Sequence, residues 1–514
     1  MALGALVVVL TLAAFLGVLK NGFVNWDDPV NFLDNPRYRG LGVSQLAWMF
    51  TTFHMGHYIP LTWLTLGADY LVWGMNPKGY HLTSLLFHVA TALCCYAVAR
   101  RLLARALPAR TSAADVALGA AMAALFFSVH PLRVESVAWV TARRDVVSGL
   151  FFMLTLLSWL KSIDASRAAR LRWYGASLVF FGCALPSKAL AVGLPLVLVV
   201  LDVYPLRRLG GAARGWGVRS ARDPLLLNVW IEKVPYVLMA TVAAGLAIAA
   251  TPASAKASLE ALSLGSRALV ASYGLAFYLV KTVLPVGLSP LHAFVTSVSW
   301  VMVTGLVLAA MVVVAMRRRW PALAGAGIVY VILLLPTLGF FAVGPQPVAD
   351  RYSYLPCLGW ALAAGGAAAW PWVGSRVVRL AGAGALALLL LLTMQQVQVW
   401  RDSVTLWSRA VALEPDNRFA RINLGGAYAT AGRTPEAIDQ YRQVLELSRD
   451  KAPRYEVLGW LYASSGHAAE GLPLLLEALR LEPGRANACL NAREAVRLLN
   501  LPPPPELEAC RPPA

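Results

Sequence analysis

The sequence predicts an all-α protein in which a bundle of membrane-spanning helices is followed by a short α-solenoid. Hydrophobic residues make up 58% of the 514 residues and charged residues only 14%, a composition too apolar for a soluble globular protein. The C-terminal part instead repeats at a fixed period, as stacked helical hairpins do. We therefore expect a membrane domain at 1–399, a repeat domain at 400–500 and a disordered tail at 501–514, where four consecutive prolines occur.

About eleven apolar segments are long enough to cross a bilayer. The region 266–291 is also apolar, but Pro285 and Pro290 interrupt it, which predicts a re-entrant or tilted pair of short segments rather than one clean span. The expected spans are 3–19, 82–99, 116–130, 146–160, 173–187, 189–204, 234–250, 300–316, 321–342, 354–370 and 380–398.

Lysine and arginine residues occupy alternate gaps between these segments, and such residues accumulate on the cytoplasmic side of a membrane. With an odd number of crossings, all basic gaps lie inside only if the N-terminus is inside and the C-terminal region outside. The formal net charge of +18 is therefore a topology signal, and no nucleic-acid partner is predicted. The basic gaps are 100–110, 161–172, 207–222, 317–319 and 376–379.

With this topology, the ionisable motifs all lie on the outer face of the membrane. The motif NWDDP places Asp27 and Asp28 directly after the first apolar segment, and an acidic pair there is costly unless it faces water, a partner or a substrate. The other outer motifs are HPLRVESVAWVTARRD (130–145), the turn ending at Lys188, the region 266–292 and VADRYSYLP (348–356).

Each motif also suits a structural role, such as a helix cap at Asp27 and Asp28 or a snorkelling Lys188. Ionisable groups gathered at helix ends on one side of a bundle are nevertheless expected mostly where a polar ligand is handled. Carboxylates beside several basic groups suit a reaction between an anionic lipid phosphate and a hydroxyl nucleophile. A carboxylate can deprotonate the hydroxyl, while arginine and lysine stabilise the leaving phosphate.

One carboxylate of the acidic pair is the candidate general base, because adjacent side chains rarely point at the same atom, and we favour Asp27 over Asp28. No His or Cys cluster has the spacing of metal ligands, so no metal site is predicted, and a divalent cation on the acidic pair stays an open alternative. Candidates for the donor phosphate or sugar are Glu135, Arg143, Arg144, Lys188, Asp350 and Arg351, and further candidates are His130, Asp145 and His292.

The C-terminal region repeats with a period of 34 residues, so that Gly425 recurs as Gly459 and Tyr428 as Tyr462. This is the period of tetratricopeptide repeats, in which small and aromatic positions let paired helices stack. Extending the frame backwards makes 400–413 half a repeat that continues from the last span. A short array of two full and two partial units is expected.

Cysteine usage adds a prediction about the compartment. Cys489 and Cys510 lie outside the spans and are able to pair if their compartment is oxidising. The cysteines within spans, which we interpret as packing residues, are Cys94, Cys95, Cys183 and Cys357.

Longer motifs occur in a fixed order along the chain. They are NWDD with a following Asn-Pro, PLTWLTLGADYLVWGMNPKGYHLTSLLFH, HPLRVESVAWVTARRDVVS, LPSKALAVGLPLVLVVLDVYPL, EKVPY and ADRYSYLP, and the repeats come last. In this order, and over essentially the whole chain, the sequence resembles the transmembrane-and-tetratricopeptide-repeat O-mannosyltransferase family. The resemblance implies a polytopic glycosyltransferase of the GT-C superfamily, which uses lipid-phosphate-linked sugars on the extracytoplasmic face. It also implies a catalytic acidic residue in the first outer loop, here Asp27 or Asp28, and repeats that engage protein acceptors.

Two places depart from the family pattern. Tyr58-Ile59 precedes Pro60 where relatives tend to carry a basic or aromatic residue next to the proline, and Leu291-His292-Ala293 replaces a Tyr-Pro-His type of ending. Because of these departures, the resemblance gives only weak support for contacts between residues 58–59 and the donor, and for a functional role of His292.

We therefore expect a glycosyltransferase that moves a sugar, mannose by analogy, from a polyprenyl-phosphate donor to a hydroxyl of a protein acceptor with inversion. No other cofactor is predicted. The Ala-, Arg- and Gly-rich composition is typical of a high-GC bacterial relative, which favours an inner membrane location with a cytoplasmic N-terminus and periplasmic repeats. Two alternatives stay open: a non-catalytic scaffold that recruits envelope proteins through its repeats, and a transporter of lipid-linked sugars.

Overall fold

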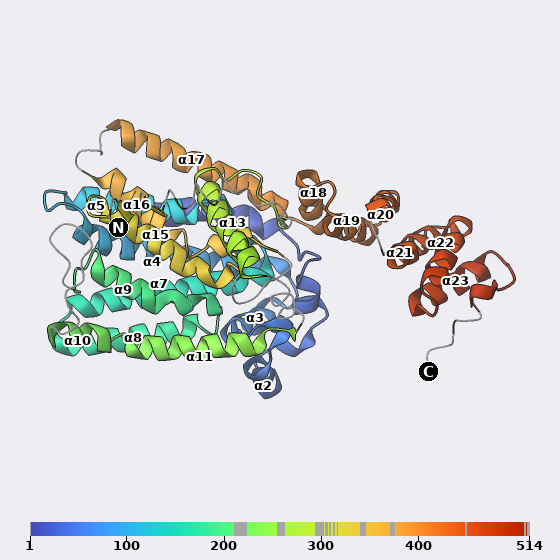
Figure 1. The fold of residues 1–514 in the computed structure, drawn as a ribbon, viewed down its shortest axis with the longest axis horizontal. Helices are drawn as coiled ribbons and strands as arrows, with labels where there is room; N and C mark the ends of the chain where they lie inside the picture. Colours follow the sequence, from blue (N-terminus) through green and yellow to red (C-terminus); the bar gives the residue numbers. More distant parts are fainter. Residues whose placement is uncertain are drawn as a thin grey trace. The chain divides into compact units, whose positions relative to one another are not determined.

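A computed structural model describes most of the chain, and its regular elements are all helices (Figure 1). No β-strand occurs among the described residues, which confirms the all-α prediction. The described residues are 2–209, 224–253, 263–292, 303, 307, 310–311, 314–315, 317–339, 346–370, 376–447, 450–507 and 510.

The chain divides into two compact units. The first comprises Met1–Phe23, Asp27–Leu288 and Phe294–Arg401, and the second comprises Val24–Trp26, Ser289–Ala293 and Asp402–Ala514.

The first unit contains the long apolar helices. Among the described residues, five segments are long and apolar enough to cross a membrane, and a sixth qualifies if two helices separated by a 55° bend form one span. The five are Ala2–Lys20, Pro77–Ala106, Val140–Asp164, Leu226–Ala250 and Arg376–Val399, and the bent pair is Ala113–Ser128 with Pro131–Ala138.

Every other predicted span also falls on a helix, except 300–316, which lies largely outside the described residues. Within the described ranges, the remaining helices are too short or too polar to meet this criterion alone, so length and composition support five or six of the roughly eleven expected crossings there. The helices of the bundle are α1 (Ala2–Phe15), α4 (Pro77–Ala106), α5 (Ala113–Ser128), α7 (Arg143–Asp164), α8 (Arg167–Ala184), α9 (Leu194–Val203), α10 (Pro224–Ile231), α11 (Val234–Ala250), α15 (Pro321–Leu334), α16 (Leu358–Ala369) and α17 (Arg376–Val399).

The region 266–291 differs from its prediction of a broken pair. Leu264–Val283 forms one continuous helix, α13, which Ser263 caps by accepting a hydrogen bond from the Ser266 amide. Because proline disfavours helical geometry in the residue before it, Pro285 ends this helix rather than dividing it. The residues that follow, through His292, form no helix.

Close helix packing in the bundle depends on glycine at one crossing. Gly119 of α5 and Gly365 of α16 each lie against the other's carbonyl oxygen, so that a Cβ atom on either would collide with backbone. Lipid tails are as apolar as leucine side chains, so burial of apolar side chains does not drive membrane helices together. Small residues instead let the helix backbones approach closely and pack.

Short helices at one end of the bundle carry the predicted motifs. Four aromatic residues, Phe32 of η2, Tyr38 of η3, Trp63 of α3 and Tyr80 of α4, belong to one buried cluster at this end. The short elements are η1 (Leu16–Lys20), η2 (Pro29–Leu33), η3 (Pro36–Tyr38), α2 (Val43–Thr51), η4 (His54–Gly56), α3 (Pro60–Trp73), η5 (Pro131–Arg133), α6 (Val134–Ala138), η6 (Val140–Ala142), η7 (Ala189–Gly193), η8 (Leu335–Thr337) and η9 (Asp350–Ser353).

The second unit consists of successive helices, of which α19 packs on α20 and α21 on α22. Gly425 lies under the ring of Tyr441, and Gly459 approaches the backbone of Gly471, so the repeated glycines occur where paired helices touch. The tetratricopeptide assignment remains an interpretation of this pattern. The helices are α18 (Ser403–Leu413), α19 (Arg418–Thr430), α20 (Thr434–Leu447), α21 (Ala452–Ser464), α22 (Ala468–Leu481) and α23 (Ala486–Leu498).

The three residues that precede Asp27 pack within the second unit. Trp26 stacks on Trp407 of α18 with ring centroids 4.8 Å apart. The Trp407 indole nitrogen donates to the Asn25 side-chain oxygen at 2.7 Å, and the Asn25 amide donates to Ser403 Oγ at 2.9 Å.

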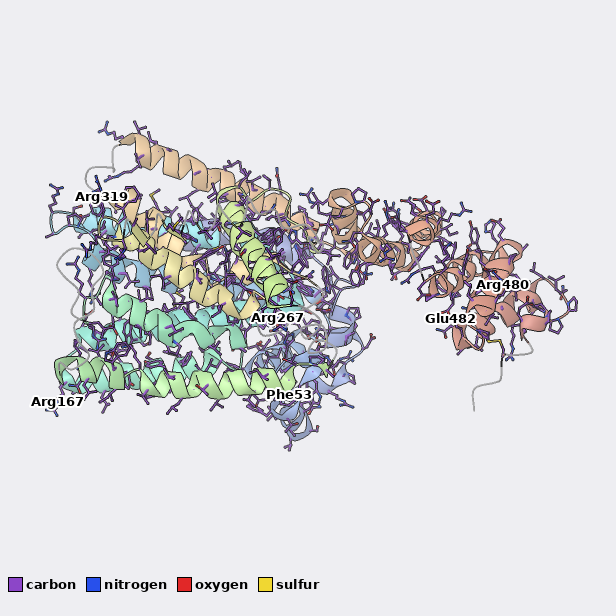
Figure 2. The ribbon with its side chains drawn as sticks, viewed as in Figure 1. Phe53, Arg167, Arg267, Arg319, Arg480 and Glu482 are labelled. Carbon is purple, nitrogen blue, oxygen red and sulfur yellow. A yellow bond between two sulfur atoms is a disulfide. The ribbon has the colours of Figure 1, made fainter. Side chains whose placement is uncertain are left out.

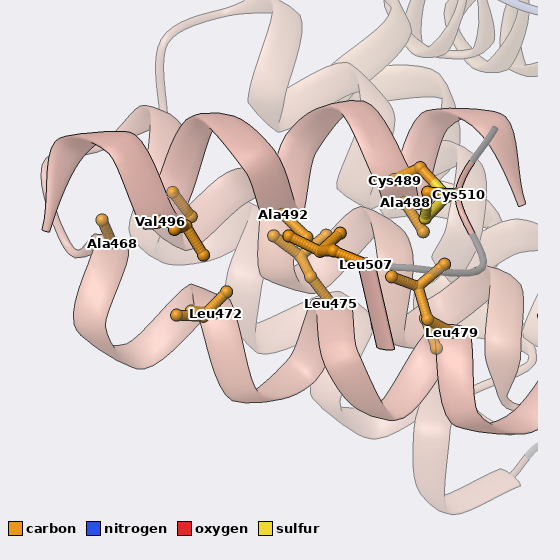
Figure 3. Packing of buried hydrophobic residues seen from close by; sticks show 12 residues of the cluster. Ala468, Leu472, Leu475, Leu479, Ala488, Cys489, Ala492, Val496, Leu507 and Cys510 are labelled. Carbon is orange, nitrogen blue, oxygen red and sulfur yellow. A yellow bond between two sulfur atoms is a disulfide. The ribbon is translucent and has the colours of Figure 1, made fainter. Parts of the chain in front are cut away.

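Two residues of the C-terminal segment are buried. Leu507, in the short helix η10 (Pro505–Leu507), and Cys510 are buried against α22 and α23, and Cys510 forms a disulfide with Cys489 (Figure 3). Leu507 and Cys510 thus pack against the last two helices, while Leu501 is exposed, and the disordered tail at 501–514 stays a prediction. Residues 511–514 lie outside the described residues.

The disulfide predicts a defined thiol count. Alkylation of the unfolded, unreduced protein should modify four of its six cysteines, and reduction should expose all six. Closing a loop across 21 residues stabilises a fold by about 3 kcal/mol, so Cys489→Ser with Cys510→Ser should make α23 cleave faster in limited proteolysis. Cys183→Ser is the control and should cleave at the wild-type rate. Six reactive thiols before reduction would contradict the pairing.

Candidate active site

The acidic loop uses its two carboxylates differently. Asp28 is 1% exposed, and its Oδ1 accepts hydrogen bonds from Thr141 Oγ1 at 2.7 Å and from the Thr141 amide at 3.3 Å. Asn31 donates to the same Thr141 hydroxyl at 3.2 Å. Asp28 therefore fastens the loop to the chain segment that leads into α7.

Asp27 is half-buried and lines a cavity of about 50 Å³. Its neighbours in the wall are polar, aromatic and aliphatic residues from three separate segments of the sequence. They are Asn31, Phe32, His54, Met55, His57, Ile59, Thr62, Trp63, Leu66, Thr141 and Arg144.

Burial raises the pKa of Asp27 above its ordinary value of 3.8, and the charges of Arg144 and Arg351 partly offset that rise. A carboxylate with a raised pKa is a stronger base than an exposed one, and nearby cations favour its ionised form. Asp27 thus has the electrostatic setting that a general base requires.

Arg144 is the notable cation of this cavity. It is 9% exposed, and its Nε atom has no hydrogen-bond partner among the described residues. A buried guanidinium group with unused donors is costly unless an anion occupies the adjacent space. Arg144 is therefore available to an anionic ligand next to Asp27.

A second, smaller cavity adjoins the next residue of α7. Asp145, Lys188 and Arg351 line it, together with Tyr352 and Tyr354. Lys188 forms an ion pair with Asp145, and its ammonium nitrogen lies 5.6 Å from the Tyr352 ring centroid. The Asp145 Oδ2 atom has no partner among the described residues.

Arg351 is fixed from two sides. It forms an ion pair with Glu135, which also accepts the Arg351 amide at 2.8 Å. The guanidinium lies 5.3 Å from the Trp139 ring centroid and 4.9 Å from that of Tyr352. Its Nε atom has no partner among the described residues, so the group is both held and able to donate further.

Arg143 occupies neither cavity wall. It is fully buried, with Nη2 donating to Asp69 Oδ2 at 2.7 Å and Nε donating to Ser84 Oγ at 2.7 Å. Thr83 donates to the other Asp69 oxygen at 2.7 Å. These contacts favour a positioning role for Arg143 over the predicted contact with a donor.

Three further predicted residues lie away from the two cavities. The His130 ring bonds the Thr282 carbonyl oxygen at 3.1 Å and accepts the Leu132 amide at 3.2 Å, which suits a structural role in the turn after α5. Asp350 is buried at the start of η9, and His292 is buried within the second unit.

His54 and His57 are site residues that the sequence analysis missed. Both line the Asp27 cavity. The charge of Arg144 is the main cause that lowers the pKa of His57 well below its ordinary value, which favours the neutral imidazole. The sequence signal was two histidines three residues apart just before Pro60, which resembles many surface loops.

Within the described part of the chain, the structure adds no candidate metal ligands to those considered from the sequence. Among the described residues, no group of three or more His, Cys, Asp or Glu side chains lies close enough to hold a metal ion. A divalent cation on the acidic pair Asp27 and Asp28 stays an alternative prediction.

Comparisons with known proteins add a family context. No family model matches the chain. Protein O-mannosyl-transferase Tmtc3 of Drosophila melanogaster is 35% identical over 136 residues, or 24% of this chain and 14% of the relative. Protein O-mannosyl-transferase TMTC2 of Homo sapiens is 33% identical over 159 residues, covering 30% and 17%. Protein O-mannosyl-transferase Tmtc2 of D. melanogaster is 35% identical over 224 residues, covering 41% and 22%.

These matches confirm the resemblance to the O-mannosyltransferase family that the ordered motifs indicate. The matched segments span less than a quarter of the length of each of these three relatives.

The Arg143–Asp69 pair gives a stability prediction. Asp69→Ala leaves a buried guanidinium unpaired, which should lower the free energy of unfolding by about 3–5 kcal/mol. The double variant Asp69→Leu with Arg143→Met removes both charges and should recover much of that loss. Thermal and chemical unfolding in detergent measure both, with Asp34→Ala on the surface as the control. Equal stability of Asp69→Ala and Asp34→Ala would contradict the account.

Proposed function

We propose, from this similarity and the geometry of the site, that the chain is a membrane glycosyltransferase acting on a hydroxyl of a protein acceptor. The donor is a sugar linked to a polyprenyl phosphate, with mannose as the sugar named for the similar proteins. Transfer takes place on the extracytoplasmic face of a bacterial inner membrane.

The observation that carries the proposal is the placement of Asp27 and Arg144 in one cavity, with the Lys188 and Arg351 cavity beside it. A base and a set of cations are the two things that transfer from a phosphate-linked sugar needs. The consecutive residues Arg144 and Asp145 line one cavity each, so both can contact one extended ligand.

In the reaction, the acceptor oxygen attacks the anomeric carbon of the sugar and forms the new glycosidic bond. The bond between that carbon and the phosphate oxygen breaks, and polyprenyl phosphate leaves with its electron pair. The hydroxyl proton passes to the Asp27 carboxylate. Arg144, Lys188 and Arg351 offset the charge that develops on the phosphate, and a single displacement inverts the anomeric centre.

Substrate entry requires the cavity to widen. A volume of about 50 Å³ holds one or two waters at about 30 Å³ each and is too small for a hexose. The turn at His54–Gly56 forms part of the wall, and Met55 has a left-handed backbone with φ 49° and is 42% exposed. We assign the widening to outward movement of this turn, since few buried contacts hold it.

The second unit is the proposed contact for the protein acceptor. Exposed apolar side chains on its helices, such as Phe419 and Trp460, are suited to an extended polypeptide. The Cys489–Cys510 disulfide favours an oxidising compartment for this unit, which agrees with repeats on the extracytoplasmic side.

The two aspartates give matched variants for testing catalysis. Asp27→Asn keeps the shape of the side chain but cannot accept the proton, so the rate of transfer to an acceptor peptide should fall roughly 10²- to 10⁴-fold. Asp28→Asn keeps an oxygen that can accept the Thr141 hydrogen bonds and should lose at most about tenfold. Equal transfer rates of Asp27→Asn and the wild type would contradict the assignment of Asp27 as the base, and no transfer by either protein would favour the scaffold alternative.

The charge of Arg144 gives a pH prediction. The transfer rate should fall as pH drops through the raised pKa of Asp27, because protonated Asp27 cannot act as a base. Arg144 lowers that pKa, so Arg144→Gln should move the acid limb of the kcat/KM profile to higher pH, while Arg144→Lys should leave it near the wild-type position. An unmoved limb, or a shift to lower pH, in Arg144→Gln would contradict the assignment.

A further inference from the structure

A third cavity, of about 880 Å³, lies between five helices of the first unit: α4, α7, α9, α15 and α16. Its size is within the roughly 300–1,000 Å³ range of small-molecule sites. Most of its wall is apolar and includes Leu102, Phe152, Met153, Val197 and Leu362.

Three arginines line the mouth of this cavity. Arg207, Arg318 and Arg319 are exposed, and none makes an ion pair with a described residue. Trp320 and Trp370 also line it and are 49% and 38% exposed, as tryptophans at a membrane interface commonly are. The mouth thus combines positive charge with the aromatic residues of an interface.

The mouth lies far from the candidate active site. Arg318 and Arg319 precede α15, whereas Leu333, near the other end of that helix, lines both this cavity and the Lys188 cavity, so the large cavity extends from its arginine mouth to the candidate active site. Fourteen helical residues span roughly 20 Å. Figure 2 shows Arg319 at the end of the bundle opposite to Phe53.

A neighbouring cavity of about 860 Å³ adds positive charge at the same end. Arg100, Arg101, Arg105 and Lys161 line it, and Leu107 belongs to both cavities. Its one acidic lining residue, Asp164, pairs with Arg101 and Arg105. The cations of this wall therefore exceed its anions.

We infer that the 880 Å³ cavity binds an anionic phospholipid, with its phosphate held by Arg207, Arg318 and Arg319 and an acyl chain along the apolar wall. Basic pockets between membrane helices recognise acidic lipid headgroups in this way. A small soluble anion would leave the apolar wall unused. A neutral isoprenoid tail entering from the active-site end would leave the arginines unused.

The test measures lipid binding by the full chain. Native mass spectrometry of the purified protein, delipidated in detergent and titrated with phosphatidylglycerol or phosphatidylcholine, should show a saturable site for phosphatidylglycerol alone. The triple variant Arg207→Gln, Arg318→Gln, Arg319→Gln should bind it roughly 10- to 100-fold more weakly. Arg319→Gln and Arg317→Gln form a matched pair, since Arg317 is exposed but does not line the cavity, and only the former should weaken binding.

Ala363→Phe separates a cavity site from general surface attraction. Ala363 lines the cavity, so a phenylalanine there should exclude the acyl chain while all arginines remain, and binding should fall as in the triple variant. Normal binding by Ala363→Phe, equal binding of both lipids, or displacement of phosphatidylglycerol by added polyprenyl phosphate would each overturn the inference. Because the readout is bound lipid, none of these outcomes depends on transfer activity.

Discussion

The burial of charge in an apolar bundle is the constraint on which this structure depends. A charged group taken out of water is costly unless a partner of opposite charge compensates it. Three ion pairs meet this requirement at one end of the first unit: Arg143 with Asp69, Lys188 with Asp145, and Arg351 with Glu135. They join segments from distant parts of the sequence. Among the described residues, Arg133 and Arg144 are buried without an ion pair; Arg133 lies over the rings of Phe127 and Tyr354, whereas Arg144 lines the cavity that contains Asp27.

The start of α7 explains how one short motif serves three purposes. Successive residues of an α-helix point about 100° apart. Arg143 reaches Asp69, Arg144 lines the Asp27 cavity, and Asp145 pairs with Lys188. Thr141, just before the helix, fixes Asp28. The start of α7 thus contacts the acidic loop and also carries Arg144 and Asp145. Because one helix end positions these groups, their relative positions depend less on movement elsewhere.

Much of the fold was predictable because hydropathy and a 34-residue period report directly on helices and their pairing. The sequence also grouped Asp27, Arg144, Lys188 and Arg351 on one side, since their loops follow from the topology. It could not separate Arg143 from Arg144, because the direction of a side chain depends on where the helix begins. His57 was missed because its neutrality results from cations distant in sequence. The four prolines at 502–505 predict disorder, and they carry no signal for the burial of Leu507 or for the Cys489–Cys510 disulfide.

The central claim is that this chain transfers a sugar from a polyprenyl phosphate to a protein hydroxyl by one displacement. The most direct measurement reconstitutes the purified chain in nanodiscs with polyprenyl-phosphate mannose and a serine- and threonine-containing peptide. Mass spectrometry should find a hexose on a hydroxyl, and NMR should find an anomeric configuration opposite to that of the donor. An unmodified peptide would contradict the activity, and a product with the donor's configuration would contradict the mechanism.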